Sequence, residues 1–406
     1  MPLASSNRMR LTYKPEAVFG VPVPGSACYN LRNTGESLDY AIATTASNEI
    51  RADRAITDLI PTDADASGDF NFEPSYGEYD WLLESLLQSN FTAFGVNGVG
   101  AAIPTSATFA ANSLTAGAAT AGASIFTSLV AGQWIKVAGS TNALQNIWAQ
   151  VSLSVAPTAT LLTFEGTPFT GATGAGGAAV TVSASRLSNG VVQRSCTLER
   201  AFLDLPQFFT HRGQTVNNMS LDVSTGGLIT GSFGFMGKDV LPPSGVTALN
   251  ATVTPSVTNG ILSAVNSVAN VLEAGVALAN TFVQSLNMKY SNNLRGQKSL
   301  SVLGNASIGS GSIDLKLSIT LYFADGTLYS KFLNNTASSF SFRLNDTAGN
   351  GYVFTLPRTK INSAKINAGS INTDVQATFE ITGLLDTVTN KVFLIDRGGV
   401  AVTPVT

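Results

Sequence analysis

Strict alternation of apolar and polar residues marks the clearest strand in this chain of 406 residues. From Ile313 to Phe323, isoleucine, leucine and phenylalanine alternate with aspartate, lysine, serine, threonine and tyrosine. This period of two predicts a long β-strand with one buried face. A weaker version runs from Phe70 to Tyr76, where Pro74 predicts that the strand ends at, or borders, the margin of a sheet.

A short amphipathic helix is predicted after each of these strands. Both helices have four apolar residues at helical spacing, namely Leu82, Leu83, Leu86 and Leu87 in the first and Leu328, Tyr329, Phe332 and Leu333 in the second. This spacing places the four side chains on one helical face. Each helix is therefore expected to cover a sheet.

The chain also repeats its own pattern. Ser47–Arg51 (SNEIR) reappears as Ser291–Arg295 (SNNLR). The echo resumes further on, with Ser195–Leu198 matching Ser341–Leu344 and Leu228–Gly237 matching Val375–Gly383. The residues between Leu87 and Ser195 have no counterpart. We predict two copies of one β-rich module, the first of which carries an insertion.

The predicted fold class is mainly β, with two tandem β-sandwich or barrel modules, each with a short helix, and a small inserted β domain. The expected division is 1–94 with 189–240 for the first module, 95–188 for the insertion and 241–406 for the second module. Short β-favouring runs predict a small barrel or sandwich in the insertion: Trp134–Val137, Ile147–Val151 and Leu161–Phe164. Its two ends must lie close together, because it interrupts a module that continues beyond it.

Composition points to a surface that other subunits cover. Charged residues make up only 12% of the chain, against about 25% in typical globular domains. Residues 1–90 hold 13 acids and 6 bases, whereas residues 241–406 hold 8 acids and 11 bases. An acidic first module and a mildly basic second one are suited to meet in an assembly. A solvated acidic face is the commoner explanation of the first count.

Targeting signals are not expected. The segment Met1–Glu16 has basic residues but no apolar stretch of the kind that a signal peptide needs. No run is long and apolar enough to predict a membrane span. The two cysteines, Cys28 and Cys196, lie far apart in the sequence and indicate a reducing compartment rather than a disulfide framework.

Catalytic chemistry finds little support in the sequence. His211 is the single histidine, which argues against a catalytic triad or a histidine-rich metal site, and we expect it in a loop. Carboxylates are numerous over 49–84, but their spacing singles out no pair suited to glycoside hydrolysis. We therefore predict no catalytic residue, no cofactor and no enzymatic role.

One segment comes near to a calcium-binding loop. Asp63, Asp65, Ser67 and Gly68 match the start of such a loop, but Pro74 stands where the closing bidentate glutamate is needed. We expect an acidic turn here, and no metal site.

Several segments together carry a family resemblance: Arg10–Gly20, Leu31–Leu38, Ser47–Arg54, Gly132–Val137, Phe233–Lys238, Asn292–Arg295 and Gly349–Arg358. In their order and spacing the chain resembles the major tail tube proteins of bacteriophages with long flexible tails, the siphoviruses. The resemblance is to the larger type, which has two tube modules and an inserted, Ig-like domain. It covers nearly the whole chain.

The resemblance implies a structural role in the virion. Such modules have two packed antiparallel sheets and a helix, and they close into rings whose inner sheets form one barrel around a channel. Six modules in a ring would need three copies of this chain, a pseudo-hexameric trimer. The implied partners are further copies, other tail proteins at the tube ends, and double-stranded DNA in transient, non-specific passage. The implied location is the virion tail, after synthesis in the cytoplasm of the host bacterium.

A DNA channel should present few unpaired cations, because each lysine or arginine that binds a phosphate slows passage. One strand face in each module supplies candidate lumen-facing residues: Asp69, Asn71, Glu73, Asp314, Lys316 and Ser318. Lys316 departs from a purely acidic wall. Alternation alone does not decide whether this face points into the channel or outward.

Two other classes of protein remain open. A secreted or surface β-sandwich protein for carbohydrate binding or adhesion would share the low charge, but it should have a signal peptide and clustered exposed aromatic residues. A polysaccharide-degrading enzyme would need an acid and base pair. If the chain is a tail tube protein, the insertion is expected on the exterior of the tube. Its expected roles there are decoration or weak attachment to bacterial surface polymers.

Overall fold

The computed structural model describes residues 3–25, 27–93, 101–102, 107–116, 126–177, 180–249, 252–278 and 282–399. Strands make up most of the regular structure, and the helices are few and short. The mainly β fold class is confirmed.

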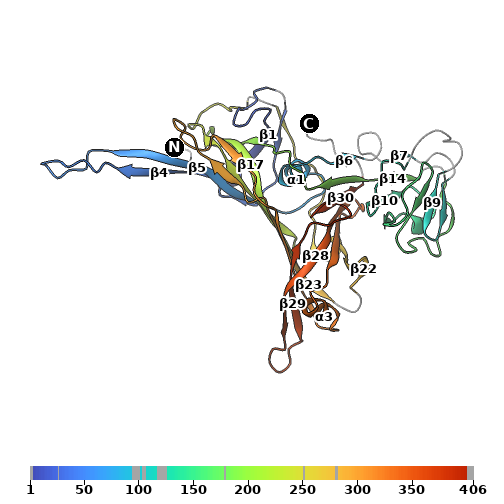
Figure 1. Cartoon of the computed structure of the whole chain (residues 1–406). Helices are drawn as coiled ribbons and strands as arrows, with labels where there is room; N and C mark the ends of the chain where they lie inside the picture. The colour runs from blue at the N-terminus through green and yellow to red at the C-terminus, as the bar shows by residue number, and fades with distance from the viewer. Residues whose placement is uncertain are drawn as a thin grey trace.

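One antiparallel sheet runs through both halves of the chain, and we call it the inner sheet (Figure 1). Its strands, in spatial order, are β4 (Asp39–Ala46), β5 (Leu59–Phe72), β18 (Thr230–Gly237), β17 (Gln207–Ser224), β23 (Val283–Ser291), β26 (Asp314–Tyr322), β29 (Gln376–Gly383) and β28 (Gly351–Asn367). Each half contributes four strands. The pair β17 and β23 joins the two halves.

Further strands, which we call the outer strands, flank the long strands β17 and β28 beyond the inner sheet. In the first half they are β1 (Met9–Pro15), β16 (Cys196–Phe202), β19 (Asp239–Val240), β2 (Ala27–Asn30) and β20 (Thr252–Thr254). In the second half they are β21 (Val268–Glu273), β22 (Val276–Ala277), β27 (Ser338–Asn345) and β30 (Leu394–Gly398). The remaining short elements are η1 (Ser6–Arg8), β3 (Gly35–Glu36), η4 (Ala143–Gln145), α2 (Ala264–Ser267), β24 (Arg295–Gln297) and β25 (Ser307–Gly309).

Strand pairing reveals an internal repeat. The order β4, β5, β18, β17 recurs as β23, β26, β29, β28, and the set β1, β16, β17, β19 recurs as β21, β27, β28, β30. Helix α1 (Asp80–Leu87) packs on β17, as α3 (Thr327–Leu333) packs on β28. We call these sets of elements the first repeat and the second repeat.

The two repeats share even a local irregularity. β17 bulges at Asn217 against β18, and β28 bulges at Asn362 against β29. Residue pairs can be matched between the repeats by counting outward from these bulges. The pair of Ala41 and Asp65 in the first repeat then corresponds to the pair of Ser291 and Asp314 in the second.

The counterpart of Ser291 is thus Ala41 and not Ser47, so the sequence match that announced the repeat is six residues out of structural register. Ser47 lies in the loop after β4. An alignment shifted by an even number of residues keeps every side chain on its own face of the strand. The apolar pattern therefore fits the shifted and the true register equally well.

One hydrophobic core extends through both repeats. Phe72 and Phe233 stack across β5 and β18 with ring centroids 4.8 Å apart. In β26 the alternate residues Leu315, Leu317, Ile319 and Leu321 are all buried, as their period of two predicts. Each such side chain contributes about 1.5–3 kcal/mol when it leaves water. β5 ends at Phe72, two residues before Pro74, in agreement with the expected strand end.

The two predicted helices form, but they are not buried alike. In α1 all four leucines are buried. In α3 only Leu328 is buried, and Leu333 at its C-terminal end is 64% exposed. The two helices therefore share an apolar pattern in sequence, but the rest of the chain covers the apolar face of α1 more completely than that of α3.

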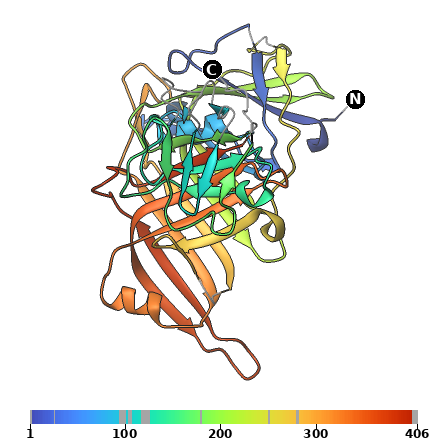
Figure 2. The ribbon, with the colours of Figure 1, turned by 90° about the vertical axis from the view of Figure 1, so that its right-hand side faces the viewer.

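Residues inserted into the first repeat form a separate structure with its own hydrophobic core, which we call the insert sandwich. Its two sheets consist of β11 (Trp148–Gln150), β10 (Trp134–Ala138), β14 (Thr181–Ser183) and β7 (Ala101–Ala102), and of β12 (Leu161–Thr163), β9 (Ser113–Thr115), β8 (Thr108–Ala110) and β13 (Gly174–Ala175). The three predicted runs appear as β10, β11 and β12. Figure 2 shows the insert sandwich in the foreground, on one side of the molecule. The expected boundary at 94–95 lies outside the described residues.

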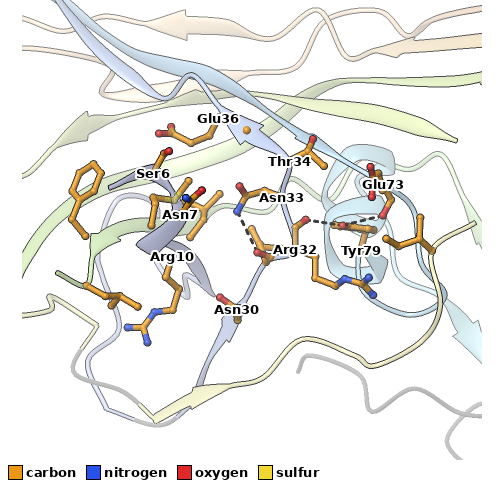
Figure 3. A pocket seen from close by; sticks show the side chains of 17 residues that line it. Ser6, Asn7, Arg10, Asn30, Arg32, Asn33, Thr34, Glu36, Glu73 and Tyr79 are labelled. Carbon is orange, nitrogen blue, oxygen red and sulfur yellow. Dashed lines mark hydrogen bonds between the residues drawn. The ribbon is translucent and has the colours of Figure 1, made fainter. Parts of the chain in front are cut away.

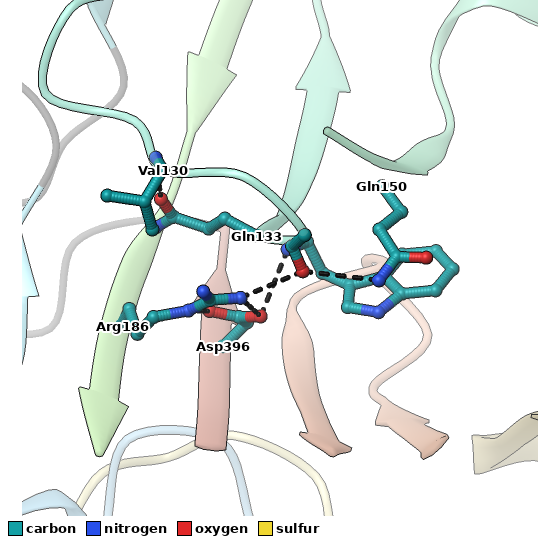
Figure 4. A network of polar contacts seen from close by, with 7 residues as sticks. Val130, Gln133, Gln150, Arg186 and Asp396 are labelled. Atoms are coloured by element: carbon teal, nitrogen blue, oxygen red, sulfur yellow. Dashed lines mark hydrogen bonds and ion pairs between the residues drawn. The ribbon is translucent and has the colours of Figure 1, made fainter. Parts of the chain in front are cut away.

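The chain enters and leaves the insert sandwich on neighbouring strands. β6 (Thr92–Ala93) pairs with β15 (Ser185–Ser188), and β15 also pairs with β30 of the second repeat. At this point Arg186 makes a two-pronged ion pair with Asp396, with both N–O distances 2.7 Å, and the Trp134 backbone N–H donates to the same carboxylate at 3.0 Å (Figure 4). The Asp396 side chain is fully buried. A buried carboxylate with these partners fixes the insert sandwich against β30.

Two local expectations prove wrong. His211 lies in β17 and not in a loop, and it is only 2% exposed. Asp63 and Asp65 lie within β5 and not in a turn, because β4 and β5 extend together as a long hairpin arm. Figure 1 shows this arm projecting away from the body of the molecule. Cys28 and Cys196 are buried free thiols.

The helices among the described residues are all too short or too polar to cross a membrane.

Candidate channel face and assembly edges

The inner sheet has one apolar face, covered by the helices and outer strands, and one polar face. Pairing register places Asp69, Gly234, Asn218, Ser291 and Asp314 in a single row across five strands of the polar face. Asp69 and Asp314, predicted from separate parts of the sequence, therefore belong to one continuous surface.

The next row contains Asn71 and Lys316. It runs from Asn71 through Ser232, Ser220 and Lys289 to Lys316. Lys316 forms an exposed ion pair with Asp314 at 2.7 Å. This partner removes the objection that Lys316 places an unpaired cation on the face.

Ser318 lies on the same face, and its hydroxyl donates to Glu380 Oε1 at 2.7 Å across β26 and β29. Glu73 is the exception among the six candidates, because it follows the end of β5. It lines a pocket of about 880 Å³ between the start of the chain and Arg32 (Figure 3). Its backbone oxygen accepts a hydrogen bond from the Tyr79 hydroxyl at 3.4 Å.

Charge divides unevenly over the polar face. The strands of the first repeat contribute the acidic residues Asp39, Asp63, Asp65, Asp69 and Asp222. Those of the second repeat contribute Lys289, Lys316, Lys360 and Lys365, together with Asp314 and Glu380. These residues together are seven acids and four bases, so the face is acidic overall, and its two ends differ in sign.

An ion-pair cluster joins the repeats at the edge of this face. Lys298, which follows β24, lies 2.7 Å from both Asp63 and Asp65 of β5. The hydrogen bond from Lys298 lowers the pKa of Asp63. The acidic residues that resembled a calcium loop are thus neutralised by a lysine from the other repeat.

The described residues include no cluster suited to hold a metal ion, and His211 is buried. No cluster of three or more histidine, cysteine, aspartate or glutamate side chains there is arranged to hold a metal ion. Burial, reinforced by the charge of Arg200, lowers the pKa of His211 to about 4. Both ring nitrogens of His211 are buried without a hydrogen-bond partner, so the residue is a neutral part of the core.

The two repeats are joined by strand pairing. Seven residue pairs link β17 to β23, from Asn218 opposite Ser291 to Ser224 opposite Ser285. The contact continues beyond β23, since the side chain of the next residue, Asn292, donates from Nδ2 to Leu86 O at the end of α1, at 2.7 Å. We call this pairing the internal junction.

Each end of the inner sheet is an unpaired edge in the part of the chain that is described. β4 pairs with β5 on one side only, and residues 360–367 of β28 pair with β29 only. Sequence reasoning missed both edges, together with Lys289, Asp222 and Glu380. A comparison of Tyr40 with Tyr290 would have set the two copies in their true register.

Comparison with known families decides the identity. A family profile described as phage tail tube protein matches residues 6–383, which includes every strand of the inner sheet. The chain belongs to the phage tail tube protein family. A search among curated proteins found no match.

The family gives the inner sheet its context. A phage tail tube protein is a structural component of the virion tail, and its copies assemble with one another and with other tail proteins. The resemblance to major tail tube proteins is confirmed. The polar face and the two unpaired edges are the features of this chain that bear on such an assembly.

Proposed function

We propose that copies of this chain close into rings, and that the rings stack into a hollow tail tube through which double-stranded DNA passes into the host. The observation that carries this proposal is the inner sheet, which crosses both repeats without a break, is apolar on one face and polar on the other, and ends in an unpaired strand on each side. Unpaired edges expose backbone N–H and C=O groups. A closed ring satisfies them all.

Three copies supply six repeats to each ring. Because the internal junction joins two repeats within a chain, a trimer has the pseudo-hexameric symmetry expected from the duplication. Three further junctions of the same kind, one between each pair of neighbouring copies, close the sheet. An open chain of copies would always retain one free edge at each end.

The polar face of the inner sheet lines the channel in this proposal. The residues proposed to face the lumen are Asp69, Asn71, Asp314, Lys316 and Ser318, with Glu73 at the margin. The excess of acidic side chains on this face suits a DNA conduit, because phosphates bind to cations and are repelled by carboxylates. The helices and outer strands then lie on the outside of the barrel.

The chain divides, in the same proposal, into a first module of 1–94 and 189–240, an inserted domain of 95–188 and a second module of 241–406. The separate core of the insert sandwich supports the division. Its attachment to β30 supports an exterior position, away from the polar face. Decoration of the tube, or weak attachment to polymers of the bacterial surface, fits such a position.

Other tail proteins are proposed to bind at the two ends of the tube. The chain is proposed to be made in the cytoplasm of the host bacterium before it enters the virion tail. No cofactor and no enzymatic step is required for this role.

Electron microscopy of the purified protein in negative stain tests the proposal. Stacked rings or long hollow tubes are expected, in equilibrium with free subunits that sedimentation resolves. A chain that stays monomeric at high concentration, in the presence of preformed tail ends as templates, would contradict it.

A further inference from the structure

We infer that β28 of one copy pairs antiparallel with β4 of the next, with Lys365 directly opposite Asp39. The inference rests on the proposed ring and adds the residues that close it. Its partner is a second copy of the same chain. The structure contains the template for this contact in its internal junction.

The template is the pairing of β17 with β23. The strand β17 corresponds to β28, since both bulge at an asparagine, Asn217 in one and Asn362 in the other. The strand β23 corresponds to β4, since each is the hairpin partner of the equivalent strand, β26 or β5. The pairing that joins the first repeat to the second therefore has an exact analogue between the second repeat and the first repeat of a neighbour.

Register transfers residue by residue. In the internal junction Ser220 lies opposite Lys289. Counting from the bulges, Ser220 corresponds to Lys365. Lys289 lies opposite Lys316, and the equivalent pair in the first repeat is Asp39 opposite Ser67. The junction between copies thus places Lys365 opposite Asp39.

This transfer turns a pair with one charged member into a pair of opposite charges. A serine opposite a lysine in the internal junction becomes a lysine opposite an aspartate between copies. Oppositely charged pairs stabilise antiparallel strands, and like charges destabilise them. Both Asp39 and Lys365 are exposed in the isolated chain, so each is available to the other.

The neighbouring position supports the same register. Tyr290 in the internal junction is opposite Met219, and both are buried. Their counterparts are Tyr40 and Ala364, which are only partly buried in the single chain. Pairing of the two edges would bury the Tyr40 ring as Tyr290 is buried.

The hairpin arm formed by β4 and β5 gives independent support. It carries aliphatic side chains that nothing in the described chain covers, with exposed fractions from 48% to 100%: Ile42, Ile50, Ile56, Leu59 and Ile60. The corresponding hairpin of the second repeat, formed by β23 and β26 with β24 and β25 between them, does not project freely. Its residues contact the first repeat, where the Gln88 side-chain amide donates to Ser310 Oγ at 2.7 Å and Lys298 reaches β5.

The surface that this arm would meet is also uncovered. Gln88 follows α1, and the equivalent end of α3 carries Leu333. Leu87 in α1 is 1% exposed, whereas Leu333 is 64% exposed. A neighbouring copy whose arm lies across the end of α3 accounts for both exposed surfaces at once.

Charge exchange tests the pair directly. Asp39→Lys alone and Lys365→Asp alone should each reduce tube formation at least tenfold, because like charges then meet at every junction between copies. The double variant D39K/K365D should restore it. The control D314K/K316D exchanges the same two charges on the same face, within one strand, and should assemble as the parent does.

Cysteine trapping tests the register. The variant A41C/S363C places thiols at positions equivalent to Ser291 and Asn218, which pair directly in the internal junction. Oxidation should give covalent oligomers on a denaturing gel. The variant A41C/K365C is two residues out of register and should give at least tenfold less. The native thiols are buried and contribute little background.

The outcomes separate this inference from the proposed function. If the parent chain forms tubes but D39K/K365D stays unassembled and A41C/S363C does not cross-link, the inferred junction is wrong and the tube role stands. If the parent forms no ring or tube under any condition, the proposed function itself fails. Restoration by the double variant together with in-register cross-linking establishes the junction.

Discussion

Asn217 and Asn362 occupy the same position in two copies of one fold, since each is the extra residue of a β-bulge in the longest strand of its repeat. Asn217 lies at the internal junction, where its Oδ1 accepts from the Leu294 N–H at 2.9 Å and its backbone oxygen accepts from the Asn292 N–H at 2.8 Å. Asn362 lies exposed at the unpaired edge of β28. A bulge bends and twists a strand, so the two halves of the inner sheet are bent at equivalent points.

Replacement of His211 by leucine should reduce the loss of the free energy of unfolding that occurs as the pH falls. The buried histidine has its pKa lowered to about 4, against about 6.5 in an unfolded chain. The unfolded state therefore binds a proton first as the pH falls, and stability declines between about pH 6.5 and pH 4. That interval is worth about 3 kcal/mol at most. Leucine is the natural choice, because the equivalent residue in β28 is the fully buried Leu356.

The measurement is the free energy of unfolding in urea at pH 7 and at pH 4.5. The parent chain should lose stability between the two, and H211L should lose less by about 2 to 3 kcal/mol. Equal losses in both proteins would show that the His211 pKa is not lowered as described.

Replacement of Asp396 by alanine should destabilise the chain strongly. The carboxylate is fully buried and accepts hydrogen bonds from Nε and Nη2 of Arg186, so its removal leaves a largely buried cation without a counter-charge. Such a loss costs about 3–5 kcal/mol. The matched control is Asp314→Ala, which removes an exposed ion pair with Lys316 and should cost less than about 1 kcal/mol. Thermal unfolding of both variants measures the difference, and similar values for the two would contradict the account of the Asp396 network.

Removal of the insert sandwich should leave assembly intact if cut at the right place. Deletion of 94–184, with a short glycine and serine linker, retains β6 and β15, whose residues Ala93 and Ser185 are paired. Tubes should still form and appear thinner in negative stain. Deletion of 95–188 also removes β15, which pairs with β30, and Arg186, the partner of Asp396, so it should destabilise the chain. A folded 94–184 deletion that makes no rings would place the insert sandwich in the ring contact.

Cysteine labelling should distinguish the polar face from the exterior. Asn71→Cys lies on the polar face and Ser154→Cys on the insert sandwich, and both positions are exposed in the single chain. A maleimide attached to a large polymer should react with both in free subunits, but only with Ser154→Cys in assembled tubes. Equal reaction at Asn71→Cys before and after assembly would show that the polar face points outward.

Sequence patterns predicted the strand faces correctly. The buried residues of β26, the four leucines of α1 and the strands β10, β11 and β12 all follow from local periodicity. Such periodicity shows which side of a strand or helix is apolar, and the apolar side is the one that is buried in the core. The mainly β fold was therefore accessible without coordinates.

The register between the two repeats and the burial of individual residues could not be predicted in the same way. The matched segments at Ser47 and Ser291 slip by six residues against the true register, and an even slip leaves the apolar pattern unchanged. The sequence predicts a loop at His211, because the polar residues beside it give no sign of the core that the long strand β17 crosses. The edges β4 and β28 become recognisable only once the pairing partners of every strand are known.

The number of copies in a ring tests the central claim most directly. Image averaging of tubes in ice, viewed end-on, gives the rotational symmetry, and mass measurement of detached rings gives the chain count independently. Three chains per ring with six similar lobes around the channel are the predicted result. A ring of six chains, or one whose inner wall is not a continuous sheet, would contradict the account.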